Sequence, residues 1–229
     1  KEEIHDTFYI GKEGSQVNVL SLTKDDHDTF FAAAEKGIYK ASASDPNLAN
    51  YNSWHQDLTI DTAATYNTIT FFAGKVFVNK RLSGGSDTLC YLSGGNWNRW
   101  MRGAYSPVSH LESNDKYLLV TYDSQVTVST PEDLTSFTNL PGAVYPRYAI
   151  TDKDGWYWIA TTYSGTNCYN PEKQIVTPFN LPGPSSYMAF SMARKGMTFI
   201  SHREDITRLS ARTGLRGATR FCISTIPTG

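Results

Sequence analysis

The stretch of sequence that decides the fold is residues 152–161, DKDGWYWIAT, followed closely by Gly165 and Tyr169. It consists of a tight Asp/Gly turn and then a strand in which aromatic and apolar residues alternate. Four other segments align with Trp158-Ile159-Ala160, and in the place of Trp158 they carry Phe30, Phe77, Leu119 and Phe199. The separations between these five anchors are 47, 42, 39 and 41 residues. A repeat of this length is typical of β-propeller blades.

A second marker gives the same period. Asn139-Leu140-Pro141-Gly142 recurs as Asn180-Leu181-Pro182-Gly183, a shift of 41 residues. Each copy follows a short strand, where Pro and Gly stop the strand and turn the chain toward the next repeat. Two unrelated markers with one period indicate an internal repeat, whereas the main rival fold, a pair of β-sandwiches, would not require one.

Each period contains about four strand-sized segments. In the second repeat these are residues 66–73, 75–80, 87–92 and 96–101, and in the fourth they are residues 148–152, 156–161, 166–169 and 175–179. The run Ala32-Ala33-Ala34-Glu35-Lys36 resembles a helix by itself, but Phe30-Phe31 before it and Gly37 after it favour a strand and a turn. The sequence therefore predicts an all-β fold, a β-propeller of four-stranded antiparallel blades, with about five blades and a partial one.

The repeat predicts that residues 1–229 form a single propeller domain made of successive blades. The predicted parts are a partial blade at 1–16, blades at 17–58, 65–101, 108–139 and 147–181, and a divergent last blade or tail at 185–229. The chain begins with Lys1 and shows no signal peptide, so we expect a segment of a longer protein. An incomplete ring would leave an unpaired sheet edge, which predicts a marginally stable or aggregation-prone fragment.

Composition limits the classes of function. With 229 residues and a net charge of −1, the chain lacks the dense positive face that nucleic-acid binding requires, so no nucleic-acid partner is expected. No apolar run is long enough to span a membrane. Cys90, Cys168 and Cys222 are widely spaced and odd in number, which argues against a zinc site or a disulfide framework. We expect no cofactor, no metal and no catalytic residues.

Three local patterns have a structural and a functional interpretation. The turn at 152–155 resembles the opening of a calcium loop, but it lacks the later acidic ligands and is better read as a hairpin turn. Asp25-Asp26-His27-Asp28 offers two types of metal ligand, yet its position in the repeat favours a solvated turn. Trp97 and Trp100 would suit stacking on a sugar, but packing of an outer blade strand is the preferred interpretation.

A ligand is expected on the loops that join blades and that join the second and third strands of a blade, since recognition residues concentrate on loops held by a rigid scaffold. Arginine and tyrosine side chains there would suit a sugar, a phosphate-bearing glycan or a protein segment. The predicted ligand-binding residues are Lys80, Arg81, Arg102, Tyr105, Tyr145, Arg147 and Tyr163.

The unit Asp152-x-Asp154-Gly155-x-x-Trp158-Ile159-Ala160-Thr161 resembles propeller repeats in the periplasmic sensor regions of Bacteroidetes hybrid two-component regulators. Residues 66–80 and 87–92 carry a closer resemblance, to the PorZ-type N-terminal β-propeller, and the resemblance covers about residues 5–200. It implies an extracytoplasmic protein of the periplasm or cell surface. The PorZ-type family works in the attachment complex of type IX secretion and is associated with anionic lipopolysaccharide.

Three hypotheses about function follow. The first is a non-catalytic binding or scaffolding module of a cell-envelope or type IX secretion-related protein, whose partners are proteins of an envelope complex or a surface glycan. The second is a periplasmic signal-sensing domain of a hybrid two-component regulator. The third is a polysaccharide-acting propeller enzyme, because such enzymes gather carboxylates from several blades. No pattern in the sequence singles out such a carboxylate pair.

Overall fold

The computed structural model describes residues 10–11, 17–82, 87–101, 107–179, 188–195, 198–204 and 220–225. Within these ranges the regular structure is β-strand, apart from one short 3₁₀ turn, η1 (Tyr51–Ser53). None of the helical segments in these ranges has the length and apolar character needed to cross a membrane.

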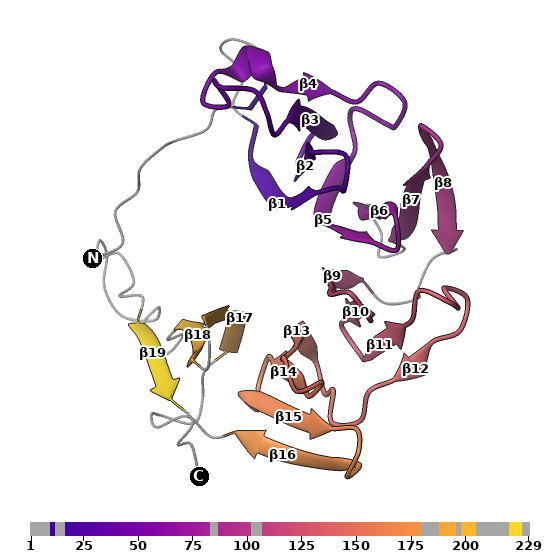
Figure 1. Cartoon of the computed structure of the whole chain (residues 1–229). Helices are drawn as coiled ribbons and strands as arrows, with labels where there is room; N and C mark the ends of the chain where they lie inside the picture. The colour runs from indigo at the N-terminus through magenta and orange to yellow at the C-terminus, as the bar shows by residue number, and fades with distance from the viewer. Residues whose placement is uncertain are drawn as a thin grey trace. The chain divides into compact units, whose positions relative to one another are not determined.

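The strands form five sheets, in which strands consecutive in sequence are neighbours (Figure 1). The first sheet holds β1 (Val19–Lys24), β2 (Thr29–Ala34), β3 (Ile38–Ser42) and β4 (His55–Gln56), and the second holds β5 (Thr65–Phe72), β6 (Lys75–Arg81), β7 (Thr88–Ser93) and β8 (Asn96–Met101). The third holds β9 (Val108–Ser113), β10 (Leu118–Tyr122), β11 (Val126–Ser129) and β12 (Thr138–Asn139). The fourth holds β13 (Pro146–Thr151), β14 (Tyr157–Thr161), β15 (Thr166–Asn170) and β16 (Ile175–Phe179), and the fifth holds β17 (Met188–Lys195), β18 (Thr198–Glu204) and β19 (Arg220–Thr225).

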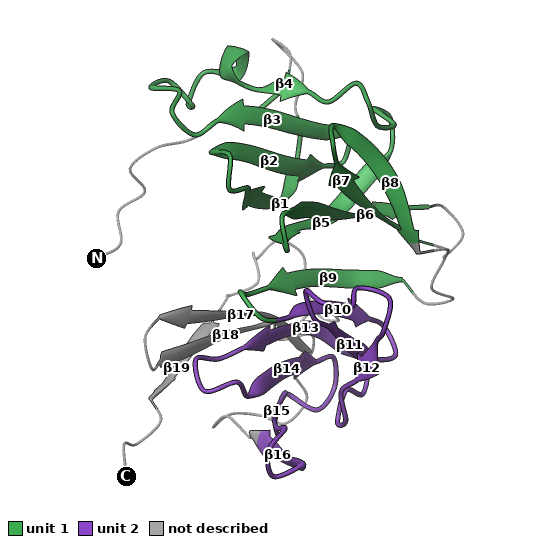
Figure 2. Cartoon of the chain, turned by 45° about the vertical axis from the view of Figure 1, so that its right-hand side comes forward, with its two compact units in different colours: residues 1–116 green, residues 117–229 purple. Residues whose placement is uncertain are grey.

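The predicted all-β class of four-stranded antiparallel sheets is confirmed. The alanine-rich run is β2, as expected, because Ala32 and Ala34 are buried on one face of the strand and Ala33 on the other. The chain divides into two compact units, residues 1–116 and 117–229, which are coloured separately in Figure 2. Each unit is described by itself below.

Each unit has a core in which two sheets face each other. In unit 1, Phe31 and Ile38 of the first sheet pack against Tyr66, Ile69 and Val78 of the second. In unit 2, the corresponding cluster joins the third and fourth sheets through the buried side chains of Leu119, Val126, Val128, Ala149, Tyr157 and Ile159. At about 25 cal/mol per Å² of apolar surface, each buried aromatic ring in such a core contributes a few kcal/mol.

A β-bulge sets the register of the repeat. The first strand of four sheets is bulged at the same place: between Val19 and Ser21, Tyr66 and Thr68, Pro146 and Tyr148, and Ala189 and Ser191. The residue after each bulge pairs with Ala33, Asn79, Ala160 and His202, respectively. Counting two residues back from these partners gives the structurally equivalent positions Phe31, Phe77, Trp158 and Ile200.

Two of the predicted anchors are therefore wrong by one residue. Phe31, not Phe30, is equivalent to Trp158, and Ile200 takes the place assigned to Phe199. The packing in unit 1 agrees, since Phe31 lies in the cluster with Tyr66, whereas Phe30 packs on the opposite face of its sheet. A shift of one residue along a strand exchanges the two faces, so the correction changes which aromatic side chain enters which core.

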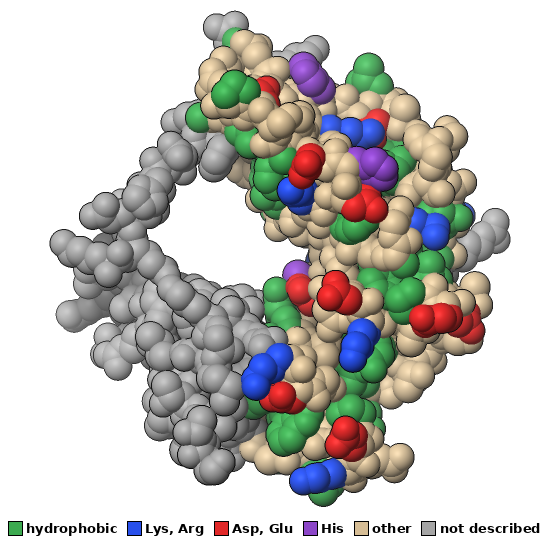
Figure 3. Space-filling model, viewed as in Figure 1, with side chains coloured by type: hydrophobic (Ala, Val, Ile, Leu, Met, Phe, Trp, Pro, Cys, Tyr) green, Lys and Arg blue, Asp and Glu red, His purple; other side chains and the backbone are tan. Residues whose placement is uncertain are grey.

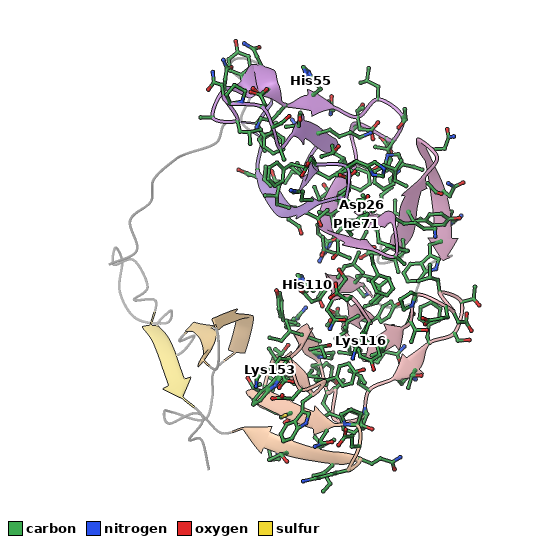
Figure 4. All side chains as sticks on the ribbon, viewed as in Figure 1. Asp26, His55, Phe71, His110, Lys116 and Lys153 are labelled. Carbon is green, nitrogen blue, oxygen red and sulfur yellow. The ribbon has the colours of Figure 1, made fainter. Side chains whose placement is uncertain are left out.

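The hairpin turns between the first and second strands of the first and fourth sheets share one design. Asp152 Oδ1 accepts backbone hydrogen bonds from Asp154 and Trp156, both at 2.9 Å. In the first sheet Asp25 Oδ1 accepts the equivalent bonds from His27, at 2.9 Å, and Thr29, at 2.7 Å. Figure 4 labels one residue of each turn, Lys153 and Asp26. These bonds confirm both segments as turns.

Candidate functional site

In each unit the sheets have one edge at which the first strand of a sheet begins and its second strand ends. We call this the loop edge. It comprises residues 35–37, 57–64 and 81–82 in unit 1, and residues 123–125, 142–145 and 162–165 in unit 2.

Exposed apolar side chains cluster at the loop edge of unit 2. Among the described side chains ten large hydrophobic residues are exposed; three of these, Val144, Tyr145 and Tyr163, lie at the loop edge of unit 2, and Leu58 and Leu82 lie at that of unit 1. Of the other five, three lie in β1, one in the turn before β14 and one in the outer strand β16. Contiguous or clustered apolar exposure is a mark of interaction sites, and single scattered residues are not.

Tyr145 and Tyr163 form the centre of this cluster in unit 2. Their rings pack edge to face, with centroids 5.5 Å apart and planes at 85°. Tyr145 is 58% exposed and Tyr163 is 69% exposed, so both rings present most of their surface to solvent while touching each other. Such a pair is itself favourable, which restrains the two rings before any ligand arrives.

Thr162 holds the backbone of Tyr145 in place. Its backbone N–H donates to the carbonyl oxygen of Tyr145 at 2.9 Å, and its hydroxyl Oγ1 donates to the same oxygen at 3.1 Å. Tyr145 has a φ of 48°, a left-handed conformation that costs a non-glycine residue of the order of 1 kcal/mol. Thr162 is 3% exposed, and its two bonds to the Tyr145 carbonyl offset this cost and fix the backbone conformation of Tyr145.

Arg147 adds a polar flank to the tyrosine pair. Its Nε donates to Thr162 Oγ1 at 3.0 Å, and its Nη1 lies 3.0 Å from Asp123 Oδ1 in the turn between β10 and β11. Both charged side chains remain about half exposed, at 47% and 40%. The pair therefore offers hydrogen-bond donors and acceptors side by side without a net charge.

In unit 1 the predicted basic residues are arranged differently. Lys80 Nζ lies 2.6 Å from Asp61 Oδ2, in the loop before β5, and this hydrogen bond lowers the pKa of Asp61. Arg81 is exposed at the end of β6, and Leu82, also exposed, follows it. By the register of the bulge, Leu82 occupies the position of Tyr163, so the same step of the repeat carries an exposed apolar side chain in both units.

The structure thus brings together three of the seven predicted residues, Tyr145, Arg147 and Tyr163. Lys80 and Arg81 lie in unit 1, and Arg102 and Tyr105 lie outside the described residues. The predicted loop position is wrong for three of the seven, because Lys80 and Arg81 end β6 and Arg147 is the second residue of β13. Sequence reasoning missed Thr162 and Asp123. The position of Thr162, directly after a predicted second strand, was a usable signal, whereas the approach of Asp123 to Arg147 depends on the packing of two sheets.

The remaining patterns serve the fold. Trp97 Nε1 donates to Asp57 Oδ2 at 2.8 Å, and the ring of Trp100 packs on Phe77 with centroids 4.8 Å apart, which confirms outer-strand packing. In the cluster Asp25-Asp26-His27, Asp25 holds the turn and Asp26 lies 2.7 Å from His27 Nδ1. On the face drawn in Figure 3, basic and acidic side chains are interspersed within each unit.

Comparison with known proteins identifies the fold. No protein-family model matches the chain, and no curated protein matches it. Among solved structures, the chain is similar to the extracellular domain of a candidate one-component system from B. thetaiotaomicron, with a TM-score of 0.64 and 12% identity over 87% of this chain and 27% of that one. It is also similar to the extracellular domain of a candidate hybrid two-component system from B. thetaiotaomicron, with a TM-score of 0.65 and 10% identity over 85% of this chain and 28% of that one.

A third similar structure is YCF48 bound to D1 peptide, with a TM-score of 0.59 and 11% identity over 83% of this chain and 62% of that chain. The chain spans about a quarter of the length of the two B. thetaiotaomicron domains. At these identities the likeness concerns the fold alone. The fold of the chain is a β-propeller built from four-stranded antiparallel blades.

Proposed function

We propose that this chain is a non-catalytic binding module of an extracytoplasmic protein and that it recognises its ligand with the loop edge of unit 2. The observation that carries the proposal is the group of three exposed apolar side chains there, centred on the restrained pair Tyr145 and Tyr163. Tyrosine and arginine are the residue types over-represented in binding hot spots, because they combine a large contact area with polar groups. Rigid side chains also lose little conformational entropy on binding.

Site-directed photo-crosslinking in the full-length protein tests this role. A photoreactive phenylalanine analogue in place of Tyr163 is expected to form adducts with an envelope protein or glycan in intact cells. The matched control carries the analogue in place of Trp156, which is also exposed but lies at the opposite edge of the same sheet. Adducts of equal yield from both positions, or from neither, would contradict a binding role of the loop edge. Turnover of a polysaccharide by the purified protein would contradict the non-catalytic part.

Two cellular contexts fit such a module. In the first it scaffolds partners in an envelope or type IX secretion-related assembly, as the resemblance to the PorZ-type propeller implies. Deleting the gene should then reduce the amount of secreted cargo at the cell surface, and unchanged cargo would remove this context.

The second context is signal sensing. It is supported by the similarity to extracellular domains of candidate one-component and hybrid two-component systems. A membrane span followed by a kinase or DNA-binding domain in the complete gene would establish it. A gene without any signalling domain would exclude it.

A further inference from the structure

We infer that the loop edge of unit 2 docks an extended, uncharged, proline-containing segment of a partner protein. The inference rests on the proposed binding role and names the chemistry of the ligand. The surface concerned consists of Val144, Tyr145, Tyr163 and Arg147, and we call it the tyrosine patch.

Ring geometry favours a small ring over a pyranose. The planes of Tyr145 and Tyr163 stand at 85°, so a sugar ring that stacks on one tyrosine cannot also stack on the other. A pyrrolidine ring is small enough to touch both, with its C–H groups against the electron-rich face of one tyrosine. Aromatic side chains that line a surface in this way are the general means by which polyproline II segments are recognised.

The exposed side chain of Val144 favours the same class of ligand. It is 57% exposed beside Tyr145 and offers no hydrogen bond through its side chain. A ligand covered with hydroxyl groups would leave those groups without partners against valine, which is unfavourable. An apolar segment would instead gain from burying it.

Charge balance disfavours an acidic ligand at the tyrosine patch. Arg147 is already paired with Asp123 at 3.0 Å, so a phosphate or carboxylate would meet the Asp123 carboxylate as well as the guanidinium. The hydrogen bonds to Thr162 and Asp123 use Nε and Nη1, and within the described part of the chain Nη2 has no partner. A polyproline II segment has free backbone carbonyls, which are acceptors suited to Nη2.

Titration of the full 229-residue chain, monitored by NMR of ¹³C-labelled tyrosine rings, tests the inference. The probes are a decaproline peptide, a Gly-Ser peptide of equal length and cellohexaose. We expect saturable shifts with decaproline, at a dissociation constant of about 1 mM or below, and none with the Gly-Ser peptide. Because the tyrosine patch and the neighbouring Asp123 carry no net charge together, affinity should change less than about twofold between roughly 50 and 500 mM salt.

Variants locate the binding. Tyr145→Ala and Tyr163→Ala should each weaken decaproline binding about tenfold or more, while Trp156→Ala leaves it unchanged. Thr162→Val, which removes the hydroxyl between Tyr145 and Arg147, should weaken binding without touching the ligand, and Thr162→Ser should restore it. Thermal melting establishes that each variant is folded; both tyrosines are exposed, so little loss of stability is expected.

Several outcomes would overturn the inference. These are no saturation with decaproline, unchanged affinity in both tyrosine variants, or cellohexaose binding that depends on the tyrosines. If photo-crosslinking at position 163 nevertheless yields adducts, the binding role stands and only the proline-containing ligand is wrong. If crosslinking and titration both fail, the proposed function fails as well.

Discussion

The indole Nε1 of Trp97 donates a hydrogen bond of 2.8 Å to the Oδ2 of Asp57, although the two residues are 40 positions apart in the chain. Asp57 is 5% exposed, and the same oxygen lies 2.6 Å from Lys40 Nζ. Its other oxygen accepts bonds from the backbone and hydroxyl of Thr59, at 3.0 and 2.6 Å. One buried carboxylate thus joins β3, the loop before β5 and the outer strand β8 of unit 1.

This carboxylate predicts an acid-dependent loss of stability. Burial opposes ionisation of Asp57, but the hydrogen bonds from Lys40, Thr59 and Trp97 outweigh burial and lower its pKa below the ordinary value. A lowered folded-state pKa stabilises the protein fully above the unfolded-state pKa of about 4, and this contribution is lost as the pH falls through the folded-state pKa. Asp57→Asn should therefore be less stable than wild type by about 2 kcal/mol at neutral pH.

Urea unfolding between neutral and acidic pH measures this difference. The gap between wild type and Asp57→Asn should narrow as the pH falls below about 4. Asp28→Asn is a suitable control, since that carboxyl is exposed and its partner Lys24 is 46% exposed. A gap that stays constant down to the lowest pH at which the chain is folded would show that Asp57 is not stabilised in its ionised form.

The corrected register predicts unequal effects of two adjacent phenylalanines. Phe31→Ala removes a side chain that is 3% exposed from the core between the first and second sheets, and should cost about 3–5 kcal/mol of unfolding free energy. Phe30 is only partly buried on the other face, with its ring 6.4 Å from Trp54, so Phe30→Ala should cost less. Chemical denaturation of both variants provides the comparison, and a larger loss for Phe30→Ala would mean that the predicted anchor was correct after all.

Two glycines with left-handed backbones differ in one respect: only one of them lies where an added side chain would be crowded by its neighbours. A Cβ at Gly37 (φ +84°) would lie 2.7 Å from Gln56 Nε2 and 3.2 Å from the Thr62 carbonyl oxygen, whereas at Gly74 (φ +70°) it meets nothing within 4 Å. Gly74→Ala should lower the free energy of unfolding by only about 1 kcal/mol, the penalty for a left-handed backbone in a residue with a Cβ. Gly37→Ala should cost about 1–2 kcal/mol more, since Gln56 would lose its bonds to Lys36 and Thr62.

Melting temperatures of the two alanine variants give the answer directly. Equal shifts would indicate that the Gln56 amide moves aside without penalty. A larger shift for Gly74→Ala would contradict the role assigned to Gly37, which also donates its N–H to the Ala64 carbonyl at 2.8 Å.

Replacing the aspartate of the turn at 152–155 should reduce stability more than replacing the equivalent aspartate in the first sheet. Asp152 accepts two backbone bonds through Oδ1, and its Oδ2 accepts a third from Trp158 Nε1 at 2.8 Å. Asp25 accepts the two backbone bonds through Oδ1. Asp152→Ala is therefore expected to lower the free energy of unfolding by about 1–2 kcal/mol more than Asp25→Ala does.

A double-mutant cycle with Trp158→Phe isolates the indole contribution. If the bond to Asp152 matters, the coupling energy between the two positions should be about 1 kcal/mol. A coupling near zero would assign the extra sensitivity to packing of the Trp158 ring rather than to its hydrogen bond.

Local sequence chemistry was sufficient for the class of fold. The Asp/Gly turn, the alternating strand at 156–161 and the recurrence near 41 residues predict four-stranded sheets, because turn residues and period-two alternation act over a few neighbours. It was not sufficient for the register of the first repeat. Phe30 and Phe31 are both aromatic, so their identity cannot tell which of them faces the neighbouring sheet, and the β-bulge that decides the matter leaves no distinct residue type.

The candidate site divides in the same way. Tyr145 and Tyr163 could be predicted because turn signals place them on loops next to strands with a recognisable pattern, whereas Arg147, predicted for the same loops, is the second residue of β13. That the two tyrosines touch and that buried Thr162 bonds to the Tyr145 carbonyl follow from the pairing of β13 with β14 within the fourth sheet, whereas the pairing of Asp123 with Arg147 follows from the third sheet packing on the fourth. Those contacts join residues 15 to 24 positions apart, and only the folded chain brings such residues within hydrogen-bond distance.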